Sequence, residues 1–458
     1  MMHDAVIIGG GPGGYVCAIR AAQLGLSVAL IERAQLGGTC LNRGCIPTKA
    51  LAHTADIVEM SGRAAEFGLV MERAVVDFAK VMSRKDRVVA RLRGGIGFLL
   101  KKRGVQVLTG TAVLAGSKAV EVTAEGGEVT RLEARNIVIA TGSEPVTPRV
   151  FGYDGDYVLT SEDVLSLKEL PKRILIIGAG VIGCEFASIF RAFGCEVSVV
   201  DIMPNILPMV DDDAAEVVKA TFKRRGIGVH TGVKISSVQV VGDAVEASTE
   251  DGQVFRADKV LLAIGRRPTT GGVGAADAGV ETGAAGEIVV DSRMRTNVPG
   301  VWAIGDVTNK MQLAHVASAQ ALAAAANMAG HDTVMNYYAV PNVIFTSPEV
   351  AAVGVSERGA KESGIVHRVA KFPFAASGKA VAMGATEGFV KIIADEHGRV
   401  IGGCVVGPHA SDIVAELGLA ITAGLDARQV AHTIHAHPTL AEAVAEAAEG
   451  IFDMSIHI

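Results

Sequence analysis

The sequence lacks a long apolar run, a basic excess and a signal peptide. No apolar stretch reaches the roughly 20 residues that a transmembrane helix needs, so a membrane-spanning chain is not expected. The net charge of −6 leaves no basic footprint for nucleic acid or for an anionic membrane surface. Residues 1–8 lack the basic segment and cleavage site of a signal peptide and have the pattern of a β-strand. We therefore expect a cytoplasmic protein that binds neither nucleic acid nor membranes.

Cysteine is too scarce for a disulfide framework, because the 458-residue chain contains only six. Four of them stand alone in apolar or glycine-rich surroundings and are expected to be small buried hydrophobes: Cys17, Cys184, Cys195 and Cys404. Cys40 and Cys45 differ, because they form a pair in a short glycine-containing stretch, residues 37–49. In a reducing cytosol such a pair is redox-active or metal-binding. A metal would need further ligands, and only His53 lies close, so we predict a redox dithiol and no metal site.

A dinucleotide-binding signature opens the chain, whose length predicts two to four domains. Residues 9–14 fit the pattern G-x-G-x-x-G between a short apolar strand and a helical stretch, and a second strand ends at Glu32. The glycines let the backbone approach a pyrophosphate at the helix N-terminus, and the acid can accept hydrogen bonds from ribose hydroxyls. The residues predicted to bind here are Gly9, Gly11, Gly14 and Glu32.

The same signature recurs in the second third of the chain. A strand at residues 173–177 leads into the turn 178–183, a helix runs to about Phe193, and the next strand ends at Asp201. An acid at this position favours a free 2′-hydroxyl and so NAD over NADP. The predicted binding residues are Gly178, Gly180, Gly183 and Asp201. The alternative, that both copies are structural α/β units that bind nothing, leaves two complete fingerprints unexplained.

The order of these motifs resembles the flavin-dependent, class I pyridine nucleotide-disulfide oxidoreductases over essentially the whole chain. The resemblance rests on both glycine-rich turns and on five further runs: residues 37–49, 139–142, 262–268, 301–307 and 435–442. It implies an α/β fold with two Rossmann-like dinucleotide-binding domains, for FAD and NAD, and a C-terminal α+β dimerisation domain. The implied divisions are an FAD-binding domain, an NAD-binding domain, a return segment that completes the FAD region, and an interface domain: 1–147, 148–270, 271–338 and 339–458.

The resemblance also implies roles for residues around the cofactors. The first glycine-rich turn and Glu32 would hold the ADP half of FAD, and Asp306 would approach its ribityl and phosphate region. Further cofactor-binding residues lie in the shared runs: Thr39, Thr141, Gly142 and Gly265. Lys49 would sit near the flavin ring and pair with Glu185, in the first turn of the NAD-domain helix. Alternatively, Lys49 is a solvated helix residue and Glu185 merely complements a helix dipole.

The motifs are most similar to those of family members that oxidise protein-bound dihydrolipoamide. This similarity implies that Cys40 meets the incoming thiol and that Cys45 lies nearer the flavin. Thiolates, not thiols, carry out the exchange, so a base is required. His437 is the candidate base, and Glu442 would orient its ring. Alternatively, Thr439 and Glu442 form a capping box in front of a short helix. We expect His435 to be structural.

The partners follow from the same resemblance. In the family the base reaches the dithiol of the other subunit, which implies an obligate homodimer built by the segment from about Tyr338 onward. The substrate would be a lipoyl-bearing protein, either the E2 component of a 2-oxoacid dehydrogenase complex or the H protein of glycine cleavage. No lipoyl domain precedes the first strand, so that group is expected to come from another polypeptide.

The sequence departs from the pattern of these enzymes at one place and differs from what rival functions would require. Residues 313–320 keep the Leu-Ala-His of the lipoamide enzymes but lack the acidic run that often follows. A glutathione-type reductase should carry an arginine-rich NADP strand end rather than Asp201. A mercuric reductase should carry a C-terminal cysteine pair, and an NADH oxidase of this fold should use one cysteine. A non-catalytic nucleotide-binding or docking subunit is expected to lack one of the two cysteines or His437, whereas this sequence contains all three.

Overall fold

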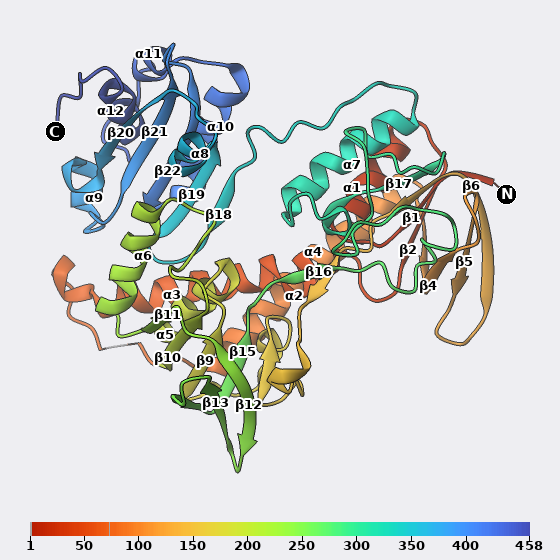
Figure 1. The fold of residues 1–458 in the computed structure, drawn as a ribbon, viewed down its shortest axis with the longest axis horizontal. Helices are drawn as coiled ribbons and strands as arrows, with labels where there is room; N and C mark the ends of the chain where they lie inside the picture. Colours follow the sequence, from red (N-terminus) through yellow and green to blue (C-terminus); the bar gives the residue numbers. More distant parts are fainter. Residues whose placement is uncertain (1, 73) are drawn as a thin grey trace.

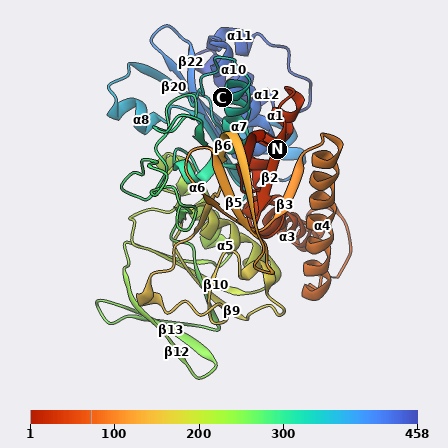
Figure 2. The same cartoon turned by 90° about the vertical axis from the view of Figure 1, so that its right-hand side faces the viewer.

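The computed structural model describes residues 2–72 and 74–458, so Met1 and Arg73 lie outside the described residues. Within them the chain forms three sheet-based units, shown in two orientations in Figures 1 and 2. The two N-terminal units carry largely parallel sheets, and the third carries an antiparallel sheet covered by helices. The predicted fold class, an α/β chain with a C-terminal α+β unit, is confirmed.

The first unit is built on a seven-stranded sheet of order β3-β2-β1-β6-β5-β4, with β17 also paired to β6. Its strands are β1 (Met2–Ile8), β2 (Val28–Glu32), β3 (Gln106–Thr109), β4 (Thr111–Leu114), β5 (Ala119–Thr123), β6 (Val129–Ile139) and β17 (Val301–Ala303). Its helices are α1 (Pro12–Gln23), α2 (Gly38–Arg43), α3 (Cys45–Gly62), η1 (Ala64–Phe67), α4 (Phe78–Lys102), η4 (Gly305–Thr308) and α7 (Ala314–Met328). Because β17, η4 and α7 come from the segment after residue 271, this late segment completes the first unit, where α7 packs against α1.

The second unit has a parallel sheet of order β11-β10-β9-β15-β8 and a separate antiparallel sheet of order β12-β13-β14. Its strands are β8 (Val158–Thr160), β9 (Arg173–Ile177), β10 (Glu196–Asp201), β11 (Gly228–Thr231), β12 (Ile235–Val241), β13 (Ala244–Thr249), β14 (Val254–Ala257) and β15 (Lys259–Leu262). Its helices are η2 (Arg149–Phe151), η3 (Val164–Ser166), α5 (Val181–Phe193) and α6 (Asp212–Arg224). A two-stranded ribbon of β7 (Ser143–Pro145) and β16 (Arg266–Pro268) connects this unit to the first.

The third unit follows as an antiparallel sheet of order β18-β19-β22-β21-β20. Its strands are β18 (Asn342–Ile344), β19 (Glu349–Gly354), β20 (His367–Pro373), β21 (Phe389–Asp395) and β22 (Val400–Gly407). Its helices are α8 (Glu357–Glu362), η5 (Phe374–Ala376), α9 (Gly378–Ala382), α10 (Ala410–Ala423), α11 (Ala427–Ala431) and α12 (Glu442–Gly450).

The strand–turn–helix–strand order predicted for both signatures is confirmed. The buried part of each core strand is apolar because a parallel sheet with helices on both faces is buried on both sides. In β1 the side chains of Ala5, Val6 and Ile7 are fully buried, and Ile176 in β9 occupies the equivalent place. Helix α3, which begins with Cys45, packs against both α4 and α5 and thus lies between the first and second units.

A fully buried lysine joins the second and third units. Lys391 Nζ, on β21, lies 2.7 Å from Asp211 Oδ2 and 2.9 Å from Asp213 Oδ1, at the start of α6. Glu357 on α8 lies 3.5 Å away. Burial by itself raises the pKa of both aspartates, but the hydrogen bonds and charges of their lysine partners outweigh it and hold their pKa values below the usual range.

Replacing this lysine should strongly destabilise the protein. In Lys391→Met the buried carboxylates lose their cation, so we expect a loss of about 3–5 kcal/mol and a lower thermal midpoint. Lys361→Met is the matched control, because its exposed ion pair with Glu357 contributes only about 0.5 kcal/mol. The lowered carboxyl pKa values stabilise the fold above about pH 4, and this contribution is lost as pH falls through the folded values. The difference in thermal midpoint between the wild type and Lys391→Met should therefore become smaller at acid pH. Equal thermal midpoints for Lys391→Met and Lys361→Met would contradict the expectation.

Candidate active site

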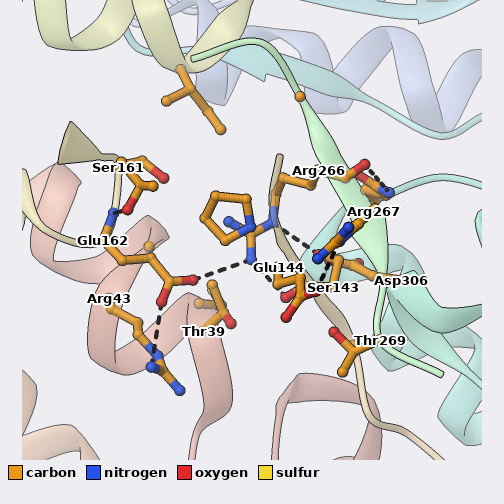
Figure 3. Close-up of a pocket in the computed structure, with 18 of the residues that line it drawn as sticks. Thr39, Arg43, Ser143, Glu144, Ser161, Glu162, Arg266, Arg267, Thr269 and Asp306 are labelled. Carbon is orange, nitrogen blue, oxygen red and sulfur yellow. Dashed lines mark hydrogen bonds and ion pairs between the residues drawn. The ribbon is translucent and has the colours of Figure 1, made fainter. Parts of the chain in front are cut away.

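A cavity of about 1700 Å³ lies between the first and second units. Both glycine-rich turns line it, and so do the two cysteines of the predicted dithiol. Figure 3 shows one part of its wall, with side chains from α2, from the β7–β16 ribbon and from the loop after β8 pointing toward one another. The tertiary structure thus brings the two dinucleotide signatures and the cysteine pair to one place.

The first turn forms a cradle suited to the pyrophosphate of a dinucleotide. Helix α1 begins at Pro12 with Gly11 as its N-cap, and N–H groups of a first helical turn have no partner within the helix. A Cβ on Gly14 would collide with the Gly9 carbonyl oxygen, so only glycine allows the helix to approach the strand this closely. Glu32 Oε2 and Oε1 accept the N–H groups of Gly10 at 2.7 Å and Ala34 at 2.8 Å. Each carboxylate oxygen keeps a second lone pair for a ribose hydroxyl.

The second turn repeats this geometry on β9 and α5. Asp201 Oδ2 accepts the N–H of Ala179 at 2.5 Å, and its Oδ1 accepts the N–H of Met203 at 2.8 Å. A Cβ on Gly183 would collide with the carbonyl oxygen of Gly178, as at the first turn. The residues of both turns therefore fit dinucleotides, and the carboxylate at each strand end lines the cavity.

The remaining cofactor residues expected from the sequence also line the cavity: Thr39, Thr141, Gly142, Gly265 and Asp306. Asp306 Oδ2 accepts a hydrogen bond of 2.6 Å from Ser143 Oγ, which in turn accepts one of 2.8 Å from Arg266 Nε. Arg266 lies 3.3 Å from Glu162, and Glu162 lies 3.3 Å from Arg43, as Figure 3 shows. This series of polar contacts links the β7–β16 ribbon to α2, the short helix that contains Cys40.

Sequence reasoning missed most of the residues in this series of polar contacts. Arg43 and Arg266 stood in runs quoted for the resemblance but were given no role, and Ser143 and Glu162 were not considered. Each of these contacts joins residues more than a hundred positions apart along the chain, including the hydrogen bond between Ser143 and Asp306. Glu162 follows β8, an edge strand of the parallel sheet, by two residues, and this strand was not predicted from the sequence; side chains at strand ends gather at the same edge of such a sheet.

The two cysteines differ in their environment. Cys40 lies within α2, whereas Cys45 is the first residue of α3, where the helix dipole favours an anion. The pKa of Cys45 is lowered to about 7, chiefly by the hydrogen bond from the Cys40 thiol and further by the charge of Lys49, against the opposing effect of burial. The same hydrogen bond raises the pKa of Cys40. Cys45 is therefore the thiolate of the reduced pair near neutral pH.

Lys49 follows Cys45 by one helical turn and so lies on the same face of α3. Its Nζ donates to both carboxylate oxygens of Glu185, at 2.8 and 2.7 Å. Glu185 is buried and is the fifth residue of α5, so it lies just beyond the first helical turn in which it was expected. The alternatives of a solvated lysine and of a glutamate that only complements a helix dipole do not describe this contact.

His437 and Glu442 lie together, but away from the dithiol of the same chain. His437 Nδ1 is 2.8 Å from Glu442 Oε1, and Glu442 Oε2 accepts the Thr439 N–H at 2.7 Å. These contacts lower the pKa of Glu442 although burial opposes them. The His437 side chain is 79% exposed, and among the described residues it does not belong to the cavity lining. Figure 1 places α11 and α12, which flank it, away from α2.

Only one of the two hydrogen bonds of the predicted capping box forms. The glutamate does reach back to the Thr439 N–H, but the Thr439 hydroxyl donates to the Ala436 carbonyl oxygen at 2.7 Å. Helix α12 begins at Glu442 with Ala441 as its N-cap, so the threonine lies outside the cap position. Neighbouring His435 pairs with Glu416 at 2.8 Å.

The four isolated cysteines are buried, as predicted. Burial raises the pKa of Cys17, Cys195 and Cys404 to about 12 and also raises that of Cys184. Over residues 2–72 and 74–458, no group of three or more His, Cys, Asp and Glu side chains could hold a metal ion. Over the same residues, no helix is long and apolar enough to cross a membrane.

Comparison with known proteins defines the class. Residues 3–321 match the pyridine nucleotide-disulphide oxidoreductase family, and residues 340–448 match the dimerisation domain of that family. The chain therefore belongs to the pyridine nucleotide-disulphide oxidoreductases and contains the part through which such proteins dimerise. The predicted family, the enzyme class of NAD-dependent flavoprotein disulfide oxidoreductases, and the cofactors FAD and NAD are confirmed.

Relatives across the full length are dihydrolipoyl dehydrogenases, which was the function predicted. The protein from Chlamydia muridarum is 47% identical over 99% of this chain and 98% of its own length. That from Geobacillus stearothermophilus is 41% identical over 99% and 97%. The crystal structure of LpdA from Mycobacterium tuberculosis matches with a TM-score of 0.93 and 29% identity over 98% and 99% of the two chains. RclA of Escherichia coli, an HOCl-induced flavoprotein disulfide reductase, matches with a TM-score of 0.88 and 29% identity over 97% and 99%.

The first turn should not tolerate a single added methyl group. Gly14→Ala places a Cβ against the Gly9 carbonyl oxygen, which pushes α1 away from β1, so we expect purified protein to lose most of its FAD. The flavin-to-protein absorbance ratio after denaturation measures this loss. Gly94→Ala is the control, because this glycine lies inside α4 with nothing within 4 Å of an added Cβ. That variant should keep its FAD and gain about 0.5–1 kcal/mol. Full FAD content in Gly14→Ala would show that the close approach is not required.

Proposed function

We propose that Cys40, Cys45 and the His437–Glu442 pair carry out the dihydrolipoyl dehydrogenase reaction, in which a protein-bound dihydrolipoyl group is oxidised to its cyclic disulfide and NAD is reduced. The observation that supports this most is the shared cavity, where the dithiol lies between two dinucleotide-binding turns. FAD bound there would supply the two-electron chemistry that connects the dithiol to NAD. The turn at Gly9–Gly14 would hold FAD, and that at Gly178–Gly183 would hold NAD.

Thiol–disulfide exchange accounts for the first half of the reaction. In the oxidised enzyme Cys40 and Cys45 form a disulfide, and a substrate thiolate attacks the Cys40 sulfur. The disulfide bond breaks and Cys45 leaves as a thiolate, which its low pKa favours. The second substrate thiolate then attacks the mixed disulfide, closes the lipoyl ring and expels Cys40. The substrate loses two electrons and two protons, and the enzyme disulfide becomes a dithiol.

His437 takes one substrate proton, and the second passes to the Cys40 sulfur as Cys40 is expelled, so that Cys45 stays a thiolate. Because a carboxylate only accepts hydrogen bonds, Nδ1 carries the proton shared with Glu442 and Nε2 is left as the base. The exposed position of His437, outside the cavity of its own chain, supports a base supplied by the partner subunit of a homodimer. Lys49 stabilises the Cys45 thiolate through its positive charge.

The identity of the protein substrate follows the same proposal. The lipoyl group would be carried by a separate polypeptide, of the E2 type or of the glycine-cleavage H-protein type. Three further predictions stay predictions: that the dimer is obligate, that the domains divide at residues 147, 270 and 338, and that the protein is cytoplasmic. Asp201 favours the NAD-linked reaction over that of an NADP-linked glutathione reductase, because its carboxylate would repel a 2′-phosphate.

The decisive measurement is anaerobic reduction of NAD by dihydrolipoamide with the FAD-loaded protein, followed by NADH absorbance. We expect rapid turnover in the wild type and a loss of roughly a thousand-fold or more in Cys40→Ser, since the substrate thiolate has no disulfide to attack. Cys195→Ala, which alters a buried cysteine between α5 and β10, should retain turnover. No NADH from a flavin-loaded wild-type dimer would refute dihydrolipoamide as substrate and leave another disulfide.

A mixed dimer tests which subunit supplies the base. Cys40→Ser and His437→Gln chains, carrying different tags, are co-expressed and the heterodimer is isolated. If the base comes from the partner, one of the two sites is intact and the heterodimer should show about half of the wild-type turnover, although each homodimer is nearly inactive. A heterodimer as inactive as its parents would place the base and the dithiol in the same chain.

A further inference from the structure

The Lys49 ammonium group is in contact with residues of the second and third units. Lys49 comes from α3 of the first unit and pairs with Glu185 from α5 of the second. Phe345 comes from the third unit, directly after β18, and its ring centroid lies 4.4 Å from Lys49 Nζ. The backbone N–H of Phe345 also donates to Glu185 Oε1 at 3.0 Å. Phe345 therefore contacts both members of the ion pair, through its ring and through its backbone.

These two contacts restrict different atoms. Glu185 is buried and needs several hydrogen-bond donors, so the Phe345 N–H fixes the carboxylate in one orientation. The Lys49 side chain is 32% exposed and has room to move. An aromatic face within about 6 Å attracts an ammonium group, most strongly where water is partly excluded. The ring is thus the contact that opposes movement of the ammonium toward solvent.

The position of that ammonium bears on the reactive thiolate. The charged and titratable groups that act on Cys45 are Cys40 from α2, Lys49 from α3 and Glu185 from α5. Lys49 favours the thiolate and Glu185 opposes it. Because the two charges act in opposite directions, their net effect depends on how close the ammonium stays to the Cys45 sulfur.

We propose that Phe345 is a positioning residue for the dithiol. Its ring holds the Lys49 ammonium, which lies one helical turn from Cys45, where the positive charge keeps Cys45 reactive as a thiolate. The proposal rests on the role given to Cys45 in the proposed function. The third unit would then act on the dithiol of its own chain through Phe345, which lies at the beginning of the unit. This role is additional to that of the His437 base, which lies near the end of the unit.

The test is the pH dependence of Cys45 alkylation in the anaerobically reduced, FAD-loaded dimer. Iodoacetamide is the probe, and peptide mass spectrometry assigns the label to Cys45. Phe345→Leu removes the aromatic face, and the pKa of Cys45 should rise by roughly half a unit to one unit. Phe345→Tyr keeps the face and should preserve the wild-type value. Phe345→Met is a second variant that keeps side-chain volume without the π-face, should the leucine variant not fold.

A double-mutant cycle separates positioning from a general structural effect. In Lys49→Met the ammonium is absent, so adding Phe345→Leu should produce no further rise. Phe389→Leu is the matched control, since this half-buried phenylalanine faces Lys371 at 5.2 Å elsewhere in the third unit. An unchanged pKa in Phe345→Leu, or an equal rise with and without Lys49, would overturn the proposal. Because alkylation needs no dihydrolipoamide, failure of the substrate assay and failure of this one are distinguishable.

Discussion

The ion pair between Lys49 and Glu185 is the contact on which the active site depends. It joins the helix that begins with Cys45 to the helix that follows the second dinucleotide turn. A buried carboxylate without a partner is costly, so the two units are held in the arrangement that pairs these residues. That arrangement creates the cavity between them, with the dithiol facing both turns. The position of Cys45 and the positions of both glycine-rich turns therefore depend on the same contact.

The third unit contacts the Lys49–Glu185 ion pair directly after its first strand, whereas the segment near its C-terminus lies away from that pair. Phe345, at the start of the unit, meets the ion pair of its own chain. His437, near the end, is exposed and paired with Glu442. A homodimer, which the family dimerisation domain supports, reconciles these positions, because a two-fold axis can carry an exposed base to the dithiol of the other chain. One unit would then position the thiolate in one subunit and supply the base to the next.

Local structure was predictable because its causes are local. The close contact between Gly14 and the Gly9 carbonyl, and the carboxylate of Glu32 on the turn N–H groups, involve neighbouring elements whose order the pattern of apolar residues reveals. The same holds at Asp201. The predicted capping box at Thr439 was only half right, because the threonine hydroxyl found a nearby carbonyl oxygen instead. A short motif specifies possible hydrogen bonds, and the fold selects among them.

The sequence alone determined the two nucleotide-binding turns, the cysteine pair, the candidate base and the order of the three units. Only the tertiary structure decided that Phe345 meets Lys49, that Glu162 bridges Arg43 and Arg266, and that Lys391 is buried among carboxylates. These contacts join residues that are mostly a hundred or more positions apart. Such pairs leave no periodicity in the sequence, because they form only when separately folded units pack together.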